Sequence, residues 1–243
     1  LMVILLFSSM GPTVQANYPD PGPGKTNLFL QNIGADDAAL GITFTNGEWG
    51  GDVWFYDTGG SIARRAQKRV LYTDFGGQIT DGWAGSARTW STEPLAAIVN
   101  ILWDSVSTAA TYPCFSSAAT TLYLPLLGVK DNYKTTYITI QNTEDANASL
   151  TMHFYDRNGS YTGSLSESLP PKTARKYYQQ WIPESSFPAT DGHGSAYITS
   201  DRRIAAVVSM HTDTNWSEGY SAVAAGDTVL WVPGVFRRDN NNG

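Results

Sequence analysis

Short segments of alternating apolar and polar residues make up most of the chain. Residues 137–140 (Tyr-Ile-Thr-Ile) and 150–155 (Leu-Thr-Met-His-Phe-Tyr) have the two-residue period of strands that bury one face. The Asn158-Gly159 dipeptide that follows them tolerates the positive φ angles of a tight hairpin. The pattern contains no helix that could connect parallel strands. We therefore expect an all-β chain of antiparallel strands.

This pattern occurs twice along the 243 residues of the chain. Length differences between the two copies fall in turn-like stretches, which is typical of a shared core with variable loops. One match at the smaller offset of 99 residues, Phe55-Tyr56-Asp57 with Phe154-Tyr155-Asp156, predicts an insertion near residues 41–51 of the first copy. The other matches lie 108 to 110 residues apart: 28–32 with 138–142, 85–87 with 194–196, 95–99 with 204–208, Tyr112 with Tyr220, and 124–125 with 232–233.

The repeat predicts the domain organisation. We expect residues 26–133 to form one β-sandwich module and residues 134–243 a second, since several short strands without crossover helices favour a sandwich. Each module is expected to end on an apolar strand that contains proline, at 122–127 and at 229–236. Proline removes a ladder donor, so these strands are predicted to lie at a sheet edge or to carry a bulge.

An uninterrupted apolar run opens the sequence and is followed by a connector rich in proline and glycine at residues 17–25. Residues 1–16 allow two interpretations. They could be the remnant of a secretory signal with cleavage before Asn17, or a mature strand that is buried on both faces. The run is too short to cross a bilayer as a helix. Its residues are Leu1, Met2, Val3, Ile4, Leu5, Leu6 and Phe7.

Composition and motifs argue against several functions. The net charge of −6 leaves no basic face for nucleic acid, and the single cysteine, Cys114, excludes disulfide frameworks and paired-cysteine metal sites. The histidines His153, His193 and His211 lack metal-binding spacing, and no nucleophile elbow or phosphate-binding loop is present. We predict that the protein is not an enzyme, that it has no catalytic residue, and that it binds no cofactor.

Three weaker candidates for binding or modification remain. Turn carboxylates at Asp36-Asp37, Glu144-Asp145 and Asp213 could hold Ca²⁺ through oxygen ligands, although water-facing carboxylates are the commoner case. Loop tryptophans could stack on sugars, or they could serve packing. The tryptophans are Trp49, Trp83, Trp90 and Trp216, and the Asn-X-Ser glycosylation patterns begin at Asn147, Asn158 and Asn215.

The segments 136–142, 154–160, 194–201 and 204–208 resemble immunoglobulin-like repeats of secreted surface proteins of bacteria and archaea. The resemblance implies tandem immunoglobulin-like sandwiches, an extracellular or cell-surface location, and a role in scaffolding or adhesion. Our leading hypothesis is a pilus-like structural subunit of a homopolymeric filament. In it, residues 1–7 are donated as a strand to a neighbouring copy, head to tail. The alternative is a secreted module that binds carbohydrate or mediates adhesion.

Overall fold

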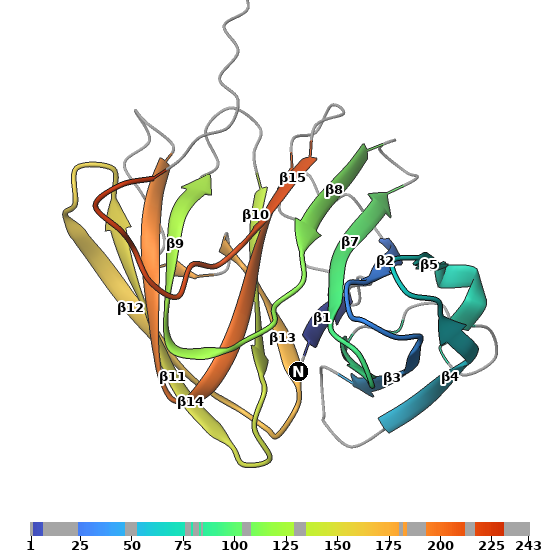
Figure 1. Cartoon of the computed structure of the whole chain (residues 1–243). Coiled ribbons are helices and arrows are strands. Elements are labelled where there is room, and N and C mark those ends of the chain that lie inside the picture. The colour runs from blue at the N-terminus through green and yellow to red at the C-terminus, as the bar shows by residue number, and fades with distance from the viewer. Residues whose placement is uncertain are drawn as a thin grey trace, which may run out of the picture.

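The protein is built almost entirely from β-strands (Figure 1). A computed structural model describes residues 2–6, 24–46, 53–75, 79, 83, 85–103, 108–128, 135–179, 182–183, 193–211 and 217–230. Within these residues every strand pair is antiparallel, and helical geometry is confined to 3₁₀ residues, including the turn η1 (Tyr72–Phe75). The expected all-β class is therefore confirmed. No helix in the described part is long and apolar enough to cross a membrane.

The first half of the chain, β1–β8, contains two four-stranded sheets. The front sheet has the order β1-β6-β3-β4, and the back sheet has the order β5-β2-β7-β8. The strands are β1 (Met2–Leu6), β2 (Lys25–Asn32), β3 (Ala38–Asn46), β4 (Val53–Ile62), β5 (Gln67–Val70), β6 (Gly85–Ser91), β7 (Leu95–Trp103) and β8 (Thr108–Pro113).

The second half, β9–β15, repeats both strand orders around one long strand. The first part of β14 pairs with β11 and β9, and its later part pairs with β10 and β15, giving β12-β11-β14-β9 in front and β13-β10-β14-β15 behind. The strands are β9 (Ala119–Gly128), β10 (Thr135–Asn142), β11 (Ala148–Asp156), β12 (Tyr161–Leu169), β13 (Ala174–Tyr178), β14 (His193–His211) and β15 (Ser217–Ser221).

The residue register of the two halves is also the same. Leu28 lies opposite Val99 in the first half, and Ile138 lies opposite Val208 in the second. Likewise Leu40 lies opposite Ser91 where Leu150 lies opposite Ser200. β14 therefore corresponds to β6 and β7 joined end to end, and the internal repeat of the sequence is a repeat of strand pairing.

One sequence match was wrong. We aligned Phe55-Tyr56-Asp57 with residues 154–156, but the register places Phe154 in β11, which corresponds to β3 and not to β4. The counterpart of Phe154 is Phe44, and both side chains are fully buried. The two Phe-Tyr-Asp tripeptides are identical in sequence but lie in strands that do not correspond, since Phe55 lies in β4 and pairs with Thr43.

The apolar strand at residues 122–127 has a different partner from the one we expected. We placed it at the end of the first module, whereas β9 pairs with β14 of the second half. The register shifts by one residue around Pro125, since Gly194 lies opposite Leu127 and Ala196 opposite Leu124. The predicted irregularity at this proline is thus a β-bulge. Of the corresponding strand predicted at 229–236, only Val229 and Leu230 are described, and neither lies in a strand.

Each half has its own hydrophobic core, and the two cores meet. Leu28, Ile42 and Phe44 are buried in the first, and Leu124, Ile138 and Phe154 are buried in the second. Ala174 and Val207 belong by sequence to the second half but pack into the first core. The two halves therefore share a packed junction, which runs between β8 and β15 in Figure 1.

Candidate assembly site

Strands β1 and β9 occupy the same position in the two halves. β1 pairs with β6 so that Ile4 lies opposite Ala87, and β9 pairs with β14 so that Leu124 lies opposite Ala196. Ala87 and Ala196 are counterparts in the repeat, and both are buried. Each half therefore has a slot beside its Gly-Ser-Ala segment that is filled by an apolar strand from earlier in the chain.

Contacts on the other edge of β9 hold it in its slot. The Tyr220 hydroxyl donates to the Leu126 carbonyl oxygen at 2.6 Å and accepts from the Leu126 amide at 3.2 Å. These bonds satisfy the backbone where the Pro125 bulge interrupts the ladder. Tyr123 and Val223 also exchange two backbone hydrogen bonds, of 2.8 and 3.0 Å. Burial, the largest influence on this group, raises the pKa of Tyr220, so its hydroxyl stays protonated.

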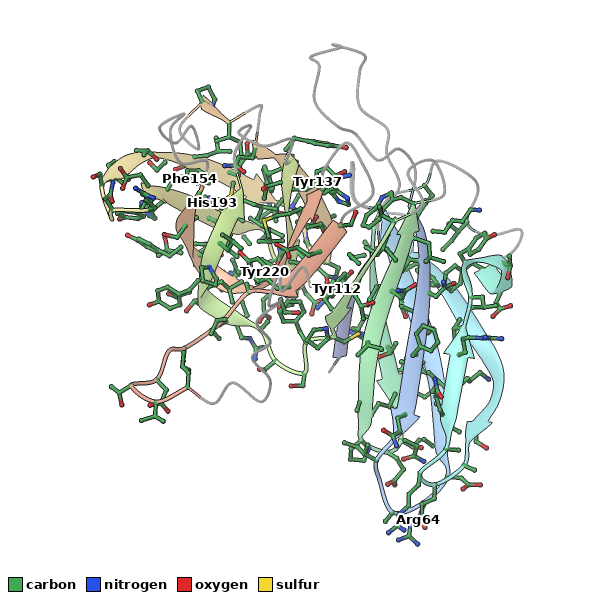
Figure 2. All side chains as sticks on the ribbon, turned by 90° about the horizontal axis from the view of Figure 1, so that it is seen from above. Arg64, Tyr112, Tyr137, Phe154, His193 and Tyr220 are labelled. Carbon is green, nitrogen blue, oxygen red and sulfur yellow. The ribbon has the colours of Figure 1, made fainter. Side chains whose placement is uncertain are left out.

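The junction between the halves is formed by β8, β15 and the end of β7. The Ser217 hydroxyl donates to Thr108 Oγ1 at 2.7 Å, and the Ser221 hydroxyl donates to the Pro113 carbonyl at 2.8 Å. Farther along, Ser86 Oγ donates to the Lys172 carbonyl at 2.9 Å. Figure 2 shows Tyr112 and Tyr220 beside this boundary, with Arg64 at the opposite tip of the first half.

His211 lies in the junction, against Trp103 of the first half, and is completely buried. Its ring centroid is 4.3 Å from that of Trp103 and 4.7 Å from that of Tyr137. Burial, with a smaller contribution from the Lys176 charge, lowers the pKa of His211 to about 3. The ring is therefore neutral at physiological pH. Its Nδ1 bonds to Ser217 Oγ at 2.7 Å, and its Nε2 has no hydrogen-bond partner among the described residues.

The His211–Ser217 pair has the spacing of a base and a nucleophile, but its surroundings favour packing. The Ser217 hydroxyl proton is directed to Thr108, and the imidazole is sealed from solvent. The remaining histidines lie elsewhere: His153 stacks on Tyr197 with ring centroids 4.5 Å apart, and His193 opens β14. Cys114 packs against the first core, and burial raises the pKa of its thiol to about 12.

The turn carboxylates considered for Ca²⁺ make other contacts. Asp37 accepts the Arg64 amide at 3.0 Å, Glu144 pairs with Arg203, and Asp145 lies 3.1 Å from Lys172 Nζ. The Arg203 hydrogen bond lowers the pKa of Glu144. Asp213 lies outside the described residues. Within the described part of the chain, no three His, Cys, Asp or Glu side chains are grouped as metal ligands would be.

The glycosylation patterns fall on turns at opposite ends of β11. Asn147 is exposed just before this strand, and Asn158 is exposed in the hairpin after it, beside Gly159 with a φ of 83°. Gly159 confirms the hairpin that the Asn-Gly dipeptide predicted. Asn215 lies outside the described residues.

The two described tryptophans among the sugar-stacking candidates differ. Trp83 packs against the first core, with its ring centroid 5.9 Å from that of Phe44, whereas Trp90 is 40% exposed. Trp90 lines a cavity of about 530 Å³ together with Thr92, Glu93 and Ser116. Trp49 and Trp216 lie outside the described residues.

Sequence reasoning missed a row of rings on the outer face of the front sheet of the second half. His153, Tyr197 and Tyr123 are direct cross-strand neighbours on β11, β14 and β9. The Tyr197 and Tyr123 centroids are 6.4 Å apart. Arg88 is the counterpart of Tyr197 in the first half, so the row is not required by the shared fold. Only the alternation of residues 195–199 hinted that Tyr197 faces outward.

Comparisons with known proteins leave the family open. No protein-family model matches the chain, and no curated protein matches it significantly. Among solved structures, the chain is similar to protein 1070 of Thermotoga maritima, with 12% identity, a TM-score of 0.38, and coverage of 44% of this chain and 96% of that one. It is also similar to the Anabaena sensory rhodopsin transducer, with 16% identity, a TM-score of 0.32, and coverage of 38% and 96% respectively.

Proposed function

We propose that the chain is a structural subunit of an extracellular homopolymeric filament, in which residues 1–7 of one subunit are inserted as a strand into a neighbouring subunit. On this proposal the halves are tandem immunoglobulin-like sandwiches. The observation that carries the proposal is the shared slot, with Ile4 opposite Ala87 and Leu124 opposite Ala196. A slot filled by an apolar strand that a connector joins to the rest of its half can accept the same strand from another chain.

The connectors explain why β1, and not β9, is the exchangeable strand. Residues 129–134 join β9 to β10, and even fully extended they reach only about 20 Å. Residues 7–24 join β1 to β2 and could reach about 60 Å. Pro19, Pro21 and Pro23 favour an extended path in this segment and cannot join a ladder as donors. The longer tether allows the strand to reach a neighbour.

The apolar run also supplies enough energy for a durable joint. Burying large apolar side chains contributes about 1.5 to 3 kcal/mol each, so the run gives a gross term on the order of 10 kcal/mol before ordering and association costs. In a head-to-tail contact that does not close, such a joint extends into a fibre. The exposed Asn-X-Ser turns at Asn147 and Asn158 support an extracellular location.

A pair of disulfide traps tests strand donation. In a Cys114→Ser background, Val3→Cys with Arg88→Cys joins neighbours on β1 and β6, and Tyr123→Cys with Tyr197→Cys joins the equivalent neighbours on β9 and β14. Directly opposite antiparallel residues are close enough for a disulfide. The first pair is expected to give a ladder of covalent oligomers on a denaturing gel, and the second only intrachain bonds.

Strand donation is wrong if the Val3–Arg88 disulfide forms only within single chains under conditions where the protein assembles. A second measurement supports the gel. Electron micrographs should show filaments of the full chain and no filaments after residues 1–16 are deleted. Filaments that survive the deletion would contradict the proposal even if the disulfide experiment failed for chemical reasons.

A carbohydrate-binding or adhesive module is the second candidate, favoured by the exposed Trp90 beside its cavity. An aromatic face next to polar groups such as Glu93 and Ser116 suits a sugar ring. This function predicts saturable binding of a glycan by the monomer. Trp90→Ala should abolish the binding, and Tyr72→Ala, which removes another exposed ring, should preserve it.

A further inference from the structure

The back sheets of the two halves have equivalent outer faces, and within the described part of the chain only that of the second half is covered. In the second half, Ala205, Val207 and Gln141 face outward from this sheet and are nonetheless buried, with Val207 only 1% exposed. The first half covers them, since Val207 packs into the first core and Trp103 lies against His211. The interface between the halves therefore uses the back face of the second half.

The equivalent face of the first half is open to solvent. Ile98 is the counterpart of Val207 and is 44% exposed. Ala96 and Gln31 correspond to Ala205 and Gln141, and both are exposed. These side chains, with Phe29 and Gln67, line a hollow of about 330 Å³ on the back sheet.

The open face also has the chemistry of a contact surface. The outward residues of β7 are Ala96, Ile98, Asn100 and Leu102, and those of β8 are Ala109, Thr111 and Pro113. None of these seven residues carries a charge, while on the neighbouring strands of this face Lys25 lies opposite Leu102 and Arg69 lies opposite Phe29. An exposed apolar side chain such as Ile98 among uncharged neighbours suits a contact surface. Since the corresponding patch in the second half is buried by another copy of the repeat, the partner indicated is again a copy of the repeat.

Contacts at the junction show which surface of the first half covers the second half. A β-carbon at Gly219 would lie 3.5 Å from Cβ of Ala110 and 3.6 Å from Cδ1 of Tyr112, whose side chains are buried in the first half. Tyr112 corresponds to Tyr220, so the counterpart of Gly219 is Thr111, which faces outward from β8. Gly219 therefore lies on the outer face of the second half, where it meets the β8 edge of the first half. The edge of one half therefore packs on the outer face of the other, and the contact is heterologous.

The second half presents the same kind of edge, and two large apolar side chains on it are exposed. Tyr220, the counterpart of Tyr112, bonds to Leu126, which lies beside Ser195 across the bulge. Ser195 is the counterpart of Ser86, which bonds across the junction to Lys172. On this edge, Leu126 is 38% exposed and Tyr123 is 47% exposed. Exposed apolar side chains thus gather on the edge of the second half that corresponds to the contact edge of the first half.

We propose that the β9–β15 edge of one subunit packs on the outer face of β2, β7 and β8 of a second copy of this chain, repeating between subunits the interface that joins the two halves. The contact rests on the homopolymer proposed above and adds a second joint to strand donation. Because it is heterologous and leaves one edge and one face unused at the ends of any chain of subunits, it extends the filament.

Complementary variants of the full chain test the contact. Ile98→Glu disables the face, and Leu126→Glu disables the edge, because each would bury an unpaired charge. Sedimentation should show that each variant alone needs an at least tenfold higher concentration to assemble, in keeping with the cost of such a charge. An equimolar mixture retains one intact edge and one intact face, so unlike subunits should pair at concentrations where neither variant associates alone. Tyr161→Glu, at an exposed ring of β12, should assemble like the unmodified chain.

The outcomes separate this contact from strand donation. Unchanged assembly of both glutamate variants overturns the contact, while a Val3–Arg88 disulfide ladder would still uphold the filament. Impaired assembly of both variants with no recovery in the mixture also overturns it, because a heterologous contact must be complemented. Loss and recovery as expected, together with only intrachain disulfides, would establish the contact and refute strand donation. A full chain that remains monomeric at high concentration refutes both.

Discussion

Asn32 and Asn142 make the same side-chain hydrogen bonds at equivalent positions of the two halves. Nδ2 of Asn32 donates to the carbonyl oxygens of Asp36 at 2.7 Å and Ile62 at 3.0 Å, and Nδ2 of Asn142 donates to those of Ala146 at 2.7 Å and Leu169 at 3.1 Å. Both asparagines are fully buried. Each joins the end of its strand to the turn that follows and to the hairpin beyond, so the pair marks a structural requirement of the repeat.

Replacing Asn142 should therefore be costly. Asn142→Ala leaves the Ala146 and Leu169 carbonyls without their buried donor, and it should lower the free energy of unfolding by about 1 to 3 kcal/mol in urea titrations. Asn147→Ala, at an exposed position five residues farther along, should change it by less than about 0.5 kcal/mol. Equal effects of the two substitutions would contradict the role given to Asn142.

The buried imidazole of His211 predicts a pH-dependent stability. Its folded pKa of about 3 lies below the usual unfolded value of about 6.5, so below pH 6.5 the unfolded chain takes up a proton that the folded chain refuses. Stability should fall as the pH drops from 6.5 toward 3, by an amount on the order of 5 kcal/mol, with no contribution from this group above 6.5.

Urea titrations across this range check the effect of His211. His211→Phe and His211→Gln both remove the titrating group, and Gln keeps a polar partner for Ser217. Both variants should lose most of the slope between pH 6.5 and 3, whatever their stability at neutral pH. A slope that persists in both variants would mean that other groups control the acid sensitivity.

The two asparagines and the junction show how far the sequence could predict this structure. The Gln-Asn match at residues 31–32 and 141–142 located the first pair, because local strand patterns and identical residues are visible in one dimension. The contact of Trp103 with His211 was not predictable, since it depends on how two sheets pack. The partner of β9 was missed for a related reason: sequence order does not determine which sheet accepts an apolar strand.

The two hydrogen bonds between the Tyr220 hydroxyl and the Leu126 backbone predict the effect of removing this hydroxyl group. Tyr220→Phe loses both bonds to the Leu126 backbone at the Pro125 bulge and should cost about 1 to 2 kcal/mol. Amide exchange at Leu126 should accelerate more than exchange in β11, which lies on the far side of β14. Tyr161→Phe, at an exposed ring, serves as the control and should leave both measurements unchanged. Unaltered protection at Leu126 would show that the ladder with β14 alone holds the strand.

Deleting residues 1–16 should expose the slot of the first half and leave that of the second half filled. β6 then loses its partner on one side, so its amides should exchange faster, while the amides of β14 remain paired with β9. A synthetic peptide of residues 1–9 should restore the protection of β6 in proportion to its concentration, because it binds only the folded chain. The same peptide with Ile4→Pro lacks a ladder donor at the residue opposite Ala87 and should restore little. If the deletion leaves exchange in β6 unchanged, the slot does not need a strand, and neither β1 nor a donated equivalent contributes to the first half.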